Sequence, residues 1–560
     1  MELIKQAILK QLASIIKAKF EIDAVNLDLV YPVFGHQGDL SLPCFSLAKS
    51  LGQAPMAIAK VLAENWTTLD SVSELKAEGP YLNFYLQTDR LARELFTNFD
   101  QSVRNVGAGA KVMLEFANGN THKEFHIGHL RNVAYGQAVL GLLGAVGYDV
   151  IPVSYVNDFG IHTAKTIWQL QQDPIDDQAG VNRGYYLGKA YAEAVAKLND
   201  NPEAKLAVGQ IMTEIESRQG ANYELWQTTR QWSVDYFKSI YAKLNINFDK
   251  FYFESDLIDQ GKLFVTDLLE RGILTVSQGA VIADLSAEDL GVLVVLRQDG
   301  TALYPVADLA LAVEKFATTD LTQSIMVVDK RQSLYFKQLF ALLHKLGYQQ
   351  SMIHLPYDVV TLPSGMMSSR LGNVILFTDL YQQCQDKLIA ETKLRHADWS
   401  GEQIKAVAEK LTVATLKFEM IKVGAEKIIT FNIDEALRFD GYTAAYLQYT
   451  GARINSLLTK AGDWSPAQAL QLAQSQEKAL VLILAKYGDI VNQSALNYEP
   501  SELTQYLFDL AQAFNDFYQS CQILSAESEV RASRLQLSAQ VGRTLRAGLA
   551  ILGIEIVQEM

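Results

Sequence analysis

Cysteine is scarce in this sequence of 560 residues, since only Cys44, Cys384 and Cys521 occur and they lie far apart in the chain. This spacing provides no disulfide framework and no cluster of metal ligands, which argues against structural zinc and is typical of a reducing cytosol. Long apolar runs are also missing, because none reaches the roughly 18 residues that a membrane-spanning helix needs. The first 20 residues interleave charged and apolar side chains, which indicates an amphipathic helix and not a signal peptide. We therefore expect a cytoplasmic protein without a structural metal or a membrane span.

The chain also lacks an excess of positive charge: 49 Lys and Arg residues stand against 63 Asp and Glu residues, a net charge of −14. An acidic total disfavours DNA as a partner, although it is compatible with a local basic face. The hydrophobic content of 49% and the charged content of 20% are ordinary for a soluble globular protein. A chain of 560 residues is too long to fold around a single hydrophobic core, so about three or four domains are expected.

Residues 111–132 combine an apolar run, a polar loop and a helix start. The apolar run 112–116 predicts a buried strand, 117–121 predict a tight loop, and a helical pattern begins around His126 and continues through Gly147. A helix start offers unpaired N–H groups and the positive end of the helix dipole, so it suits an anion such as a phosphate.

The predicted helix opens with His126-Ile127-Gly128-His129. Two imidazoles three positions apart lie on one face of the first turn, and Gly128 allows a flat ligand to approach the backbone. A lone histidine at a helix start is more often a surface or capping residue. Here two of only 8 histidines flank a glycine at a strand-to-helix turn, which favours a nucleotide triphosphate site.

These residues resemble the HIGH element of class I aminoacyl-tRNA synthetases. Glu115-Phe116, Asn120, Lys123-Glu124-Phe125 and Leu130-Arg131 around it resemble the arginyl-tRNA synthetase family in particular. The resemblance extends over nearly the whole chain. It implies that ATP, as its Mg²⁺ complex, activates L-arginine to arginyl-adenylate, which is transferred to tRNA(Arg) with release of AMP and pyrophosphate. It also implies that Lys123, His126 and His129 are the catalytic residues that stabilise phosphate charge.

A second strand pattern, 149–156, ends at Asn157-Asp158-Phe159-Gly160, and a helix starts near His162. Strand, helix, strand and helix in this order predict an α/β fold with a doubly wound, Rossmann-like parallel sheet. Ligands bind beyond the carboxyl ends of such strands, so loops 117–121 and 157–160 should share one edge. Residues 173–247 read as a helical insertion that is too short to hold an editing domain.

Two apolar runs, 292–296 and 301–306, flank Asp299-Gly300, which predicts a hairpin followed by a helix over 309–316. Asp308 would then be a helix N-cap, which is the ordinary role of such a residue. In the resembled family a Tyr-x-x-x-Asp segment here binds the guanidinium group, although Ala307 replaces an Arg that the family often has. The resemblance thus assigns arginine binding to Glu115, Asn120, His126, Tyr304, Asp308 and Gln332.

A further strand, 324–328, leads through Asp329-Lys330-Arg331-Gln332 to a helix that ends near Gly347, and a Pro-, Gly- and Ser-rich stretch follows it. This stretch is typical of an exposed loop and resembles the KMSKS element, with Met366 in place of its first Lys. In the family, the lysine that precedes HIGH, here Lys123, takes over the missing charge. The competing interpretation is a flexible loop without a ligand. The resemblance assigns ATP binding to His126, Gly128, His129, Met367, Ser368, Ser369 and Arg370.

We predict a catalytic domain over 106–380 between two flanking domains. Residues 1–105 form a small α+β unit that resembles the family's tRNA-contacting N-terminal domain. Residues 381–560 are helical and resemble its anticodon-binding bundle. Exposed aromatic side chains there can stack on bases, whereas core packing is the ordinary fate of each. The candidates for tRNA contact are Tyr449, Arg453, Tyr518 and Met560.

The sequence is therefore identified as a member of the arginyl-tRNA synthetase family, and we expect a monomer with tRNA(Arg), L-arginine and ATP as partners. Two alternatives remain. A small-molecule nucleotidylyltransferase shares the HIGH-type turn, but it does not account for the long helical C-terminal region. A non-catalytic tRNA-binding relative is kept open by Met366 and Ala307.

Overall fold

The computed structural model describes residues 1–560 except 23–26, 33–37, 176–181, 199–200, 319 and 364–374. Its centre is a sheet of five strands in the order β11-β10-β4-β5-β6, in the part of the chain that is described. All neighbouring strands run parallel, which confirms the predicted α/β fold. The strands are β4 (Lys111–Glu115), β5 (Asp149–Val156), β6 (Lys250–Phe253), β10 (Gln323–Asp329) and β11 (Ser351–Tyr357).

The alternation of side chains along the central strands divides the core into two layers. In β4, Val112 and Leu114 join the apolar cluster that contains the helix α5 (Ile127–Ala145), whereas Met113 joins a second cluster. In β10, Ile325 belongs to the first cluster and Met326 to the second. Successive side chains of a strand point to opposite faces, so helices cover both faces of this sheet. The second cluster is covered by α10 (Glu254–Glu270), α11 (Tyr304–Thr318) and α12 (Ser333–Lys345).

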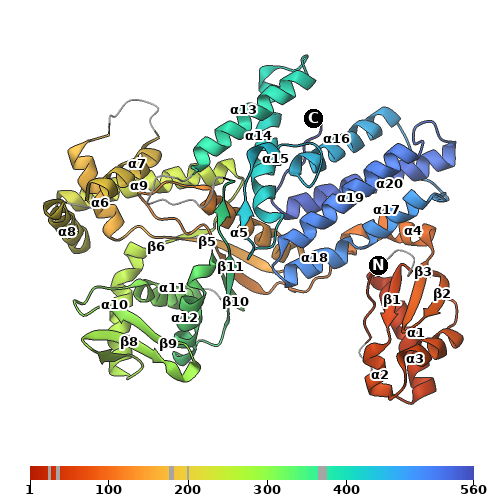
Figure 1. Cartoon of the computed structure of the whole chain (residues 1–560), viewed down its shortest axis with the longest axis horizontal. Helices are drawn as coiled ribbons and strands as arrows, with labels where there is room; N and C mark the ends of the chain where they lie inside the picture. Colours follow the sequence, from red (N-terminus) through yellow and green to blue (C-terminus); the bar gives the residue numbers. More distant parts are fainter. Residues whose placement is uncertain (23–26, 33–37, 176–181, 199–200, 319, 364–374) are drawn as a thin grey trace.

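Between β5 and β6, where the sequence predicts a helical insertion over 173–247, the described residues form four helices. All four contribute to a small core of their own, in which Ile167, Ile211 and Trp226 are buried. Figure 1 shows this helical group at one end of the molecule, opposite the N-terminal unit. The helices are α6 (Ile161–Gln172), α7 (Arg183–Leu198), α8 (Pro202–Ser217) and α9 (Ala221–Lys243).

The predicted hairpin turn at Asp299-Gly300 forms, since the N–H of Leu303 donates to the carbonyl of Val295 over 3.0 Å, but the second run is not a strand from Tyr304 onward. Strand β9 (Gly291–Leu296) pairs with its predecessor β8 (Ala280–Leu285), and only an isolated bridge joins Leu296 to Ala302. Helix α11 begins at Tyr304, because Pro305 suits the first turn of a helix and Val306 packs against α10. Asp308 therefore lies inside α11 and is not its N-cap. Strand β7 (Thr275–Ser277) completes this antiparallel sheet in the order β7-β8-β9.

The N-terminal unit packs a three-stranded antiparallel sheet, in the order β1-β3-β2, against helices. Two helices follow β1 within the described residues, because Gly52 adopts a φ of +63° and Pro55 starts a new helix. The unit contacts the C-terminal helices through Lys5, whose Nζ lies 2.6 Å from Asp489. Its elements are α1 (Glu2–Phe20), β1 (Leu40–Pro43), α2 (Phe45–Leu51), α3 (Pro55–Glu64), β2 (Val72–Glu78), β3 (Tyr81–Leu86) and α4 (Thr88–Asn98).

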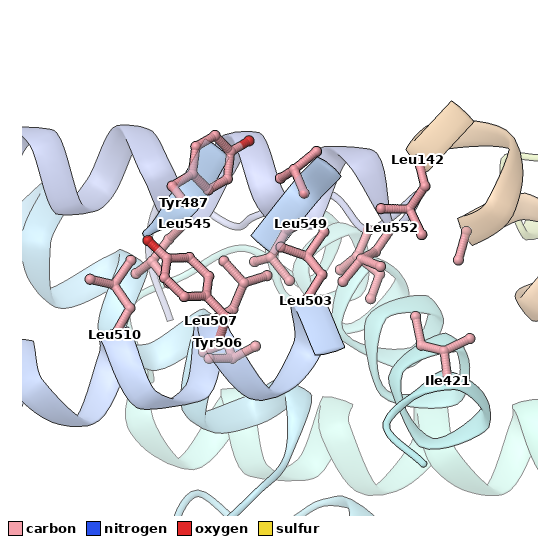
Figure 2. Packing of buried hydrophobic residues seen from close by; sticks show 14 of the residues in the cluster. Leu142, Ile421, Tyr487, Leu503, Tyr506, Leu507, Leu510, Leu545, Leu549 and Leu552 are labelled. Carbon is pink, nitrogen blue, oxygen red and sulfur yellow. The ribbon is translucent and has the colours of Figure 1, made fainter. Parts of the chain in front are cut away.

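The C-terminal part is helical, as expected, and it packs directly on α5. The predicted boundary at 380/381 falls inside the first of its helices. A Cβ atom at Gly141 of α5 would collide with the carbonyl of Ile551, so the glycine permits this close approach. Figure 2 shows Leu142 of α5 beside Leu552 in the same apolar cluster. A short parallel pair, β12 (Val360–Thr361) with β13 (Ile429–Thr430), also joins the two parts. The helices are α13 (Phe377–Arg395), α14 (Gly401–Ile421), α15 (Ile433–Ala436), α16 (Ala444–Ala461), α17 (Ser475–Ala485), α18 (Tyr487–Leu496), α19 (Pro500–Ser520) and α20 (Ser528–Ile551).

Candidate active site

The turn that follows β4 is held by a side chain of α5. Ala117 adopts a φ of +61°, and its N–H donates to Oδ1 of Asn132 over 2.5 Å. The Nδ2 of Asn132 donates to the carbonyl of Val327 over 2.8 Å, so α5 ties the ends of β4 and β10 together.

The loops after β4 and β5 meet at one edge, as predicted from the parallel sheet. The N–H of Asn157 donates to the carbonyl of Gly119 over 3.0 Å, and the N–H of Thr121 donates to the carbonyl of Asn157 over 3.0 Å. The next residue, Asp158, is fully buried and accepts from the N–H and hydroxyl of Ser255. Asp158 therefore anchors the loop to the start of α10.

His126 caps α5, and His129 completes the cap. The N–H of Gly128 donates to Nδ1 of His126 over 3.1 Å, and the N–H of His126 donates to Nδ1 of His129 over 3.2 Å. The two imidazole rings stack with their centroids 3.8 Å apart. A Cβ at Gly128 would lie 3.0 Å from the ring of His126, so the glycine also makes room for the histidine itself.

Both imidazoles are neutral near pH 7. Burial, together with the charge of Lys123, lowers the pKa of His126 to about 4. Burial and the neighbouring His126 lower the pKa of His129 well below its ordinary value. Because both Nδ1 atoms accept backbone hydrogen bonds, each ring carries its proton on Nε2, which makes Nε2 the donor available to a ligand.

The strand ends and α5 surround one cavity of about 1070 Å³. All six residues that were predicted to bind arginine line this cavity, and so do Gly128 and His129. Lys123 is not among its lining residues, and Met366, Met367, Ser368, Ser369 and Arg370 lie outside the described residues. The cavity thus contains the two carboxylates and the two imidazoles that the predicted site requires. The six residues are Glu115, Asn120, His126, Tyr304, Asp308 and Gln332.

Asp308, a carboxylate that lines this cavity, accepts hydrogen bonds from tyrosine hydroxyls. Burial raises the pKa of Asp308 to about 7, whereas hydrogen bonds from the hydroxyls of Tyr335 and Tyr155 lower it and the charge of Glu115 raises it. Sequence reasoning missed both tyrosines as site residues. Tyr335 lies on α12, and no local pattern indicates which of its turns faces Asp308.

Glu115 already has a cationic partner. Its Oε2 pairs with Nζ of Lys315, and its Oε1 accepts from Nδ2 of Asn118 over 2.8 Å. The side chains of Glu115 and Lys315 are each only 4% exposed, so this is a buried ion pair. Sequence reasoning missed Lys315, although its position seven residues after Asp308 places both on one face of α11.

A further carboxylate lies at the same edge. Glu254 follows β6 directly and accepts from Nδ2 of Asn157 over 3.2 Å. Burial raises the pKa of Glu254 to about 8, and the charge of Asp308 contributes to the shift. Its position immediately after a strand was the signal that could have indicated this residue.

Lys123 lies in the turn between Asn120 and His126, half-buried, with its Nζ 5.3 Å from the ring centroid of Tyr191. Burial, followed by the charge of Lys165, lowers the pKa of Lys123. The turn places the ammonium group of Lys123 near the two imidazoles, and its positive charge contributes to the lowered pKa of both histidines.

Comparison with known families agrees with this geometry. The family described as "tRNA synthetases class I (R), catalytic domain" matches residues 93–431. The chain belongs to the arginyl-tRNA synthetase family. The flanking segments match "Arginyl tRNA synthetase N terminal domain" over residues 2–86 and "DALR anticodon binding domain" over residues 447–560.

Relatives of this arginyl-tRNA synthetase family member cover nearly its full length. It is 35% identical to the arginine–tRNA ligase of Bdellovibrio bacteriovorus, over 96% of this chain and 95% of the relative. It is 31% identical to that of Treponema denticola, over 96% and 95%. Among solved structures, it resembles the arginyl-tRNA synthetase of Thermus thermophilus with a TM-score of 0.84 and 27% identity, over 99% of this chain and all of that one.

Three of the four candidate tRNA contacts come together in the C-terminal helices of this family member. Nη2 of Arg453 donates to the hydroxyl of Tyr449 over 2.8 Å, and the guanidinium lies 4.6 Å and 5.1 Å from the ring centroids of Tyr449 and Tyr518. Tyr518 is 38% exposed. Met560 packs elsewhere, against the apolar cluster that contains Leu388. The structure thus groups Tyr449, Arg453 and Tyr518 and does not bring Met560 to them.

No group of three or more His, Cys, Asp or Glu side chains is placed to hold a metal ion among the residues that the structure describes. In the same described ranges, none of the helices is both long and apolar enough to cross a bilayer.

Proposed function

We propose that the chain ligates L-arginine to tRNA(Arg) through an arginyl-adenylate formed from ATP. The observation that carries this proposal is one cavity lined both by Asp308 and by the stacked pair His126 and His129. A carboxylate flanked by tyrosine hydroxyls suits a planar cation with five N–H donors, and two Nε2–H donors suit a phosphate. A pocket for an amino acid and a pocket for a nucleotide are thereby adjacent.

The substrate guanidinium pairs with Asp308, whose own neighbours hold the carboxylate in place. Asn120, Tyr304 and Gln332 contact the remaining polar groups of arginine, together with His126. Glu115 contributes negative charge from the end of β4, although Lys315 neutralises part of it. Lysine, which is a point charge, fits such a planar arrangement less well than arginine, so selection occurs at binding.

In the first step, an oxygen of the arginine carboxylate attacks the α-phosphorus of ATP, and the bond from that phosphorus to the bridging oxygen breaks. Pyrophosphate leaves with the electron pair. Both nucleophile and leaving group belong to the substrates, so the protein positions them and stabilises charge. His126 and His129 donate to phosphate oxygens, Lys123 adds a positive charge, and ATP enters as its Mg²⁺ complex. The assignment of Met367, Ser368, Ser369 and Arg370 to ATP stays a prediction from the resemblance.

In the second step, a hydroxyl of the terminal ribose of tRNA takes the arginyl group from the adenylate, and AMP leaves. We propose the division 1–105, 106–380 and 381–560 for the domains, with the first and last in contact with tRNA. The cluster of Tyr449, Arg453 and Tyr518 supports a contact with unpaired bases, since aromatic rings and guanidinium planes stack on them. Met560 stays a prediction. We further propose that the protein acts as a monomer in the cytoplasm.

Arginine-dependent exchange between ATP and pyrophosphate, with and without tRNA, tests this function. We expect exchange that requires arginine and is not supported by lysine. Exchange that is independent of any amino acid would indicate a nucleotidylyltransferase. Binding of tRNA without exchange under either condition would indicate a non-catalytic relative, and both results would overturn the proposal.

A further inference from the structure

The ammonium group of Lys315 reaches Glu115 inside the cavity. Its Nζ pairs with Oε2 of Glu115, both side chains line the cavity, and each is only 4% exposed. Glu115 ends β4, and its register partner on β10, Met326, also lines the cavity. Lys315 comes from α11, which covers this face of the sheet. The ion pair is therefore part of the pocket wall and is not a surface contact.

Both carboxylate oxygens of Glu115 are already paired. While Oε2 faces Lys315, Oε1 accepts from Nδ2 of Asn118 over 2.8 Å. Oδ1 of Asn118 accepts in turn from the backbone N–H of Tyr155 over 3.4 Å, so β5 fixes the orientation of this amide. A guanidinium pairs best with a carboxylate that offers both oxygens to its parallel N–H groups. A substrate guanidinium would thus have to compete with Lys315 and Asn118 for Glu115.

Asp308 lacks such a cationic partner. Its hydrogen bonds come from the neutral hydroxyls of Tyr335 and Tyr155, and in the part of the chain that is described it forms no ion pair with a lysine or arginine. Asp308 lines the same cavity as the ion pair, so a cationic side chain that enters the cavity finds a free carboxylate here. Burial raises the pKa of Glu254 to about 8, so that carboxyl group carries little charge near pH 7. The charged and titratable groups around Asp308 are Glu115 of β4, Tyr155 of β5, Glu254 at the start of α10, Lys315 of α11 and Tyr335 of α12.

The ion pair changes the charge that the cavity offers to a substrate. Two unpaired carboxylates in one buried cavity repel each other, and one of them takes up a proton. With Glu115 neutralised by Lys315, the cavity instead presents one free carboxylate to one guanidinium group.

We propose that Lys315 is a positioning residue for the amino-acid substrate: it holds Glu115 in a neutral pair and thereby leaves Asp308 as the carboxylate that receives the guanidinium group. This inference rests on the proposed function and deepens it, because it gives the two carboxylates different tasks. The sequence resemblance, in contrast, assigns direct contact with arginine to both. Glu115 acts on arginine through Lys315, and Asp308 contacts the guanidinium.

Direct binding of arginine, measured by titration calorimetry on the full chain at pH 7.5, tests this division of tasks. Glu115→Gln leaves Lys315 without its partner, and the freed ammonium competes with the substrate for Asp308, so the affinity for arginine should fall by about tenfold or more. Adding Lys315→Met removes the competing charge, and the double variant should bind arginine within about threefold of wild type. Direct contact between Glu115 and the guanidinium predicts the opposite, because the double variant would stay as weak as Glu115→Gln.

The pH dependence of arginine affinity provides a readout that lost stability does not change. Besides burial, the charge of Glu115 raises the pKa of Asp308, and the charge of Lys315 lowers it. Arginine binds the ionised form of Asp308, so the midpoint of the affinity follows this pKa. Lys315→Met should therefore move the midpoint to higher pH, Glu115→Gln should move it to lower pH, and the double variant should lie between them.

Circular dichroism establishes that each variant is folded before it is titrated. Recovery of binding needs only Glu115→Gln and the double variant, and the upward shift of the midpoint needs only Lys315→Met, so one single variant that does not fold leaves the other measurement in place. Lys345→Met is the matched control. Lys345 of α12 pairs with Glu288 over 2.8 Å and neither lines the cavity, so this variant should change neither the affinity nor the midpoint.

Two results would overturn the inference. One is a double variant that binds arginine as weakly as Glu115→Gln does. The other is a midpoint that moves in the same direction, or not at all, in the two single variants. Either result in a protein whose wild type shows arginine-dependent exchange refutes the inference alone. The expected pattern of binding in a wild type without exchange would instead refute the proposed function and leave the task of Lys315 in place.

Discussion

The guanidinium of Arg131 donates from Nη2 to the carbonyl of Ala425 over 2.6 Å, and to that of Lys427 over 2.9 Å. Arg131 lies on α5, one turn after the double imidazole, and is 1% exposed. The N–H of Ala425 in turn donates to Glu499, which precedes α19, over 3.2 Å. The helix that starts at His126 and His129 is therefore connected by hydrogen bonds to the C-terminal bundle.

Arg131→Met should destabilise the protein by about 3 kcal/mol, because it leaves buried carbonyl groups without their charged donor. Urea unfolding followed by circular dichroism measures this change. Arg543→Met is the control, since Arg543 and Asp100 form a largely exposed pair, and its cost should stay below about 1 kcal/mol. Equal effects of the two variants would contradict the assignment of a joining role to Arg131.

Asp308→Ala should raise the KM for arginine by about 100-fold or more, because the cationic guanidinium loses its carboxylate partner in a cavity. The affinity for ATP should change by less than about twofold, since the proposed phosphate donors are His126 and His129 and not Asp308. Steady-state exchange kinetics and ATP titration give the two quantities. Normal arginine kinetics in this variant would remove Asp308 from the arginine pocket.

Arginine binding should depend on pH through the carboxyl group of Asp308. Its pKa is raised to about 7, so the group is largely protonated at pH 6 and ionised at pH 8, whereas the substrate guanidinium stays charged throughout. The affinity for arginine should therefore rise by about tenfold from pH 6 to pH 8 and level off above, with release of a proton on binding near pH 6.5. Calorimetry in buffers of different ionisation enthalpy measures both effects.

Two variants identify the group responsible for this pH dependence. Tyr335→Phe removes a hydrogen bond that lowers the pKa of Asp308, so it should move the midpoint to higher pH. Glu254→Gln removes the carboxyl group whose pKa is raised to about 8, and the step near pH 7 should persist. An affinity that is flat from pH 6 to pH 8 in the wild type would refute the pH mechanism.

The buried pair of Glu115 and Lys315 should behave as a coupled unit in unfolding experiments. Lys315→Met alone leaves a carboxylate buried without a cation, and it should cost about 3–5 kcal/mol. The double variant Glu115→Gln with Lys315→Met removes both charges and should recover at least about 2 kcal/mol of that loss. Additive single effects in this double-mutant cycle would show that the two side chains do not compensate each other.

The sequence was sufficient for the parts of the site that local patterns specify. The strand run 112–116 and the helix start around His126 follow from strand composition and from helix periodicity, and each lies where it was predicted. Lys315 and Tyr335 were missed because each reaches the cavity from a helix, and the rotation of a helix on a sheet depends on tertiary packing.

The wrong second half of the hairpin has a similar origin. Residues 301–306 are apolar enough for a strand, but α11 begins at Tyr304, and the carbonyl of Val306 lies so close to Gly261 of α10 that a Cβ atom there would collide with it. The local sequence of this segment is compatible both with a strand and with a helix start. Packing against α10, some forty residues earlier in the chain, favours the helix. Local patterns contain no information about that partner.

The close contact of Gly141 with Ile551 has a consequence for the stability of truncated fragments of this enzyme. Most side chains of α5 are buried, and part of this helix packs against the C-terminal helices, as Leu142 beside Leu552 shows in Figure 2. A fragment that ends after the central sheet would expose the apolar side of α5 to solvent, and exposed apolar surfaces drive association. We therefore expect such fragments to aggregate. The catalytic domain and the C-terminal helices should therefore fold stably only when both are present in one chain.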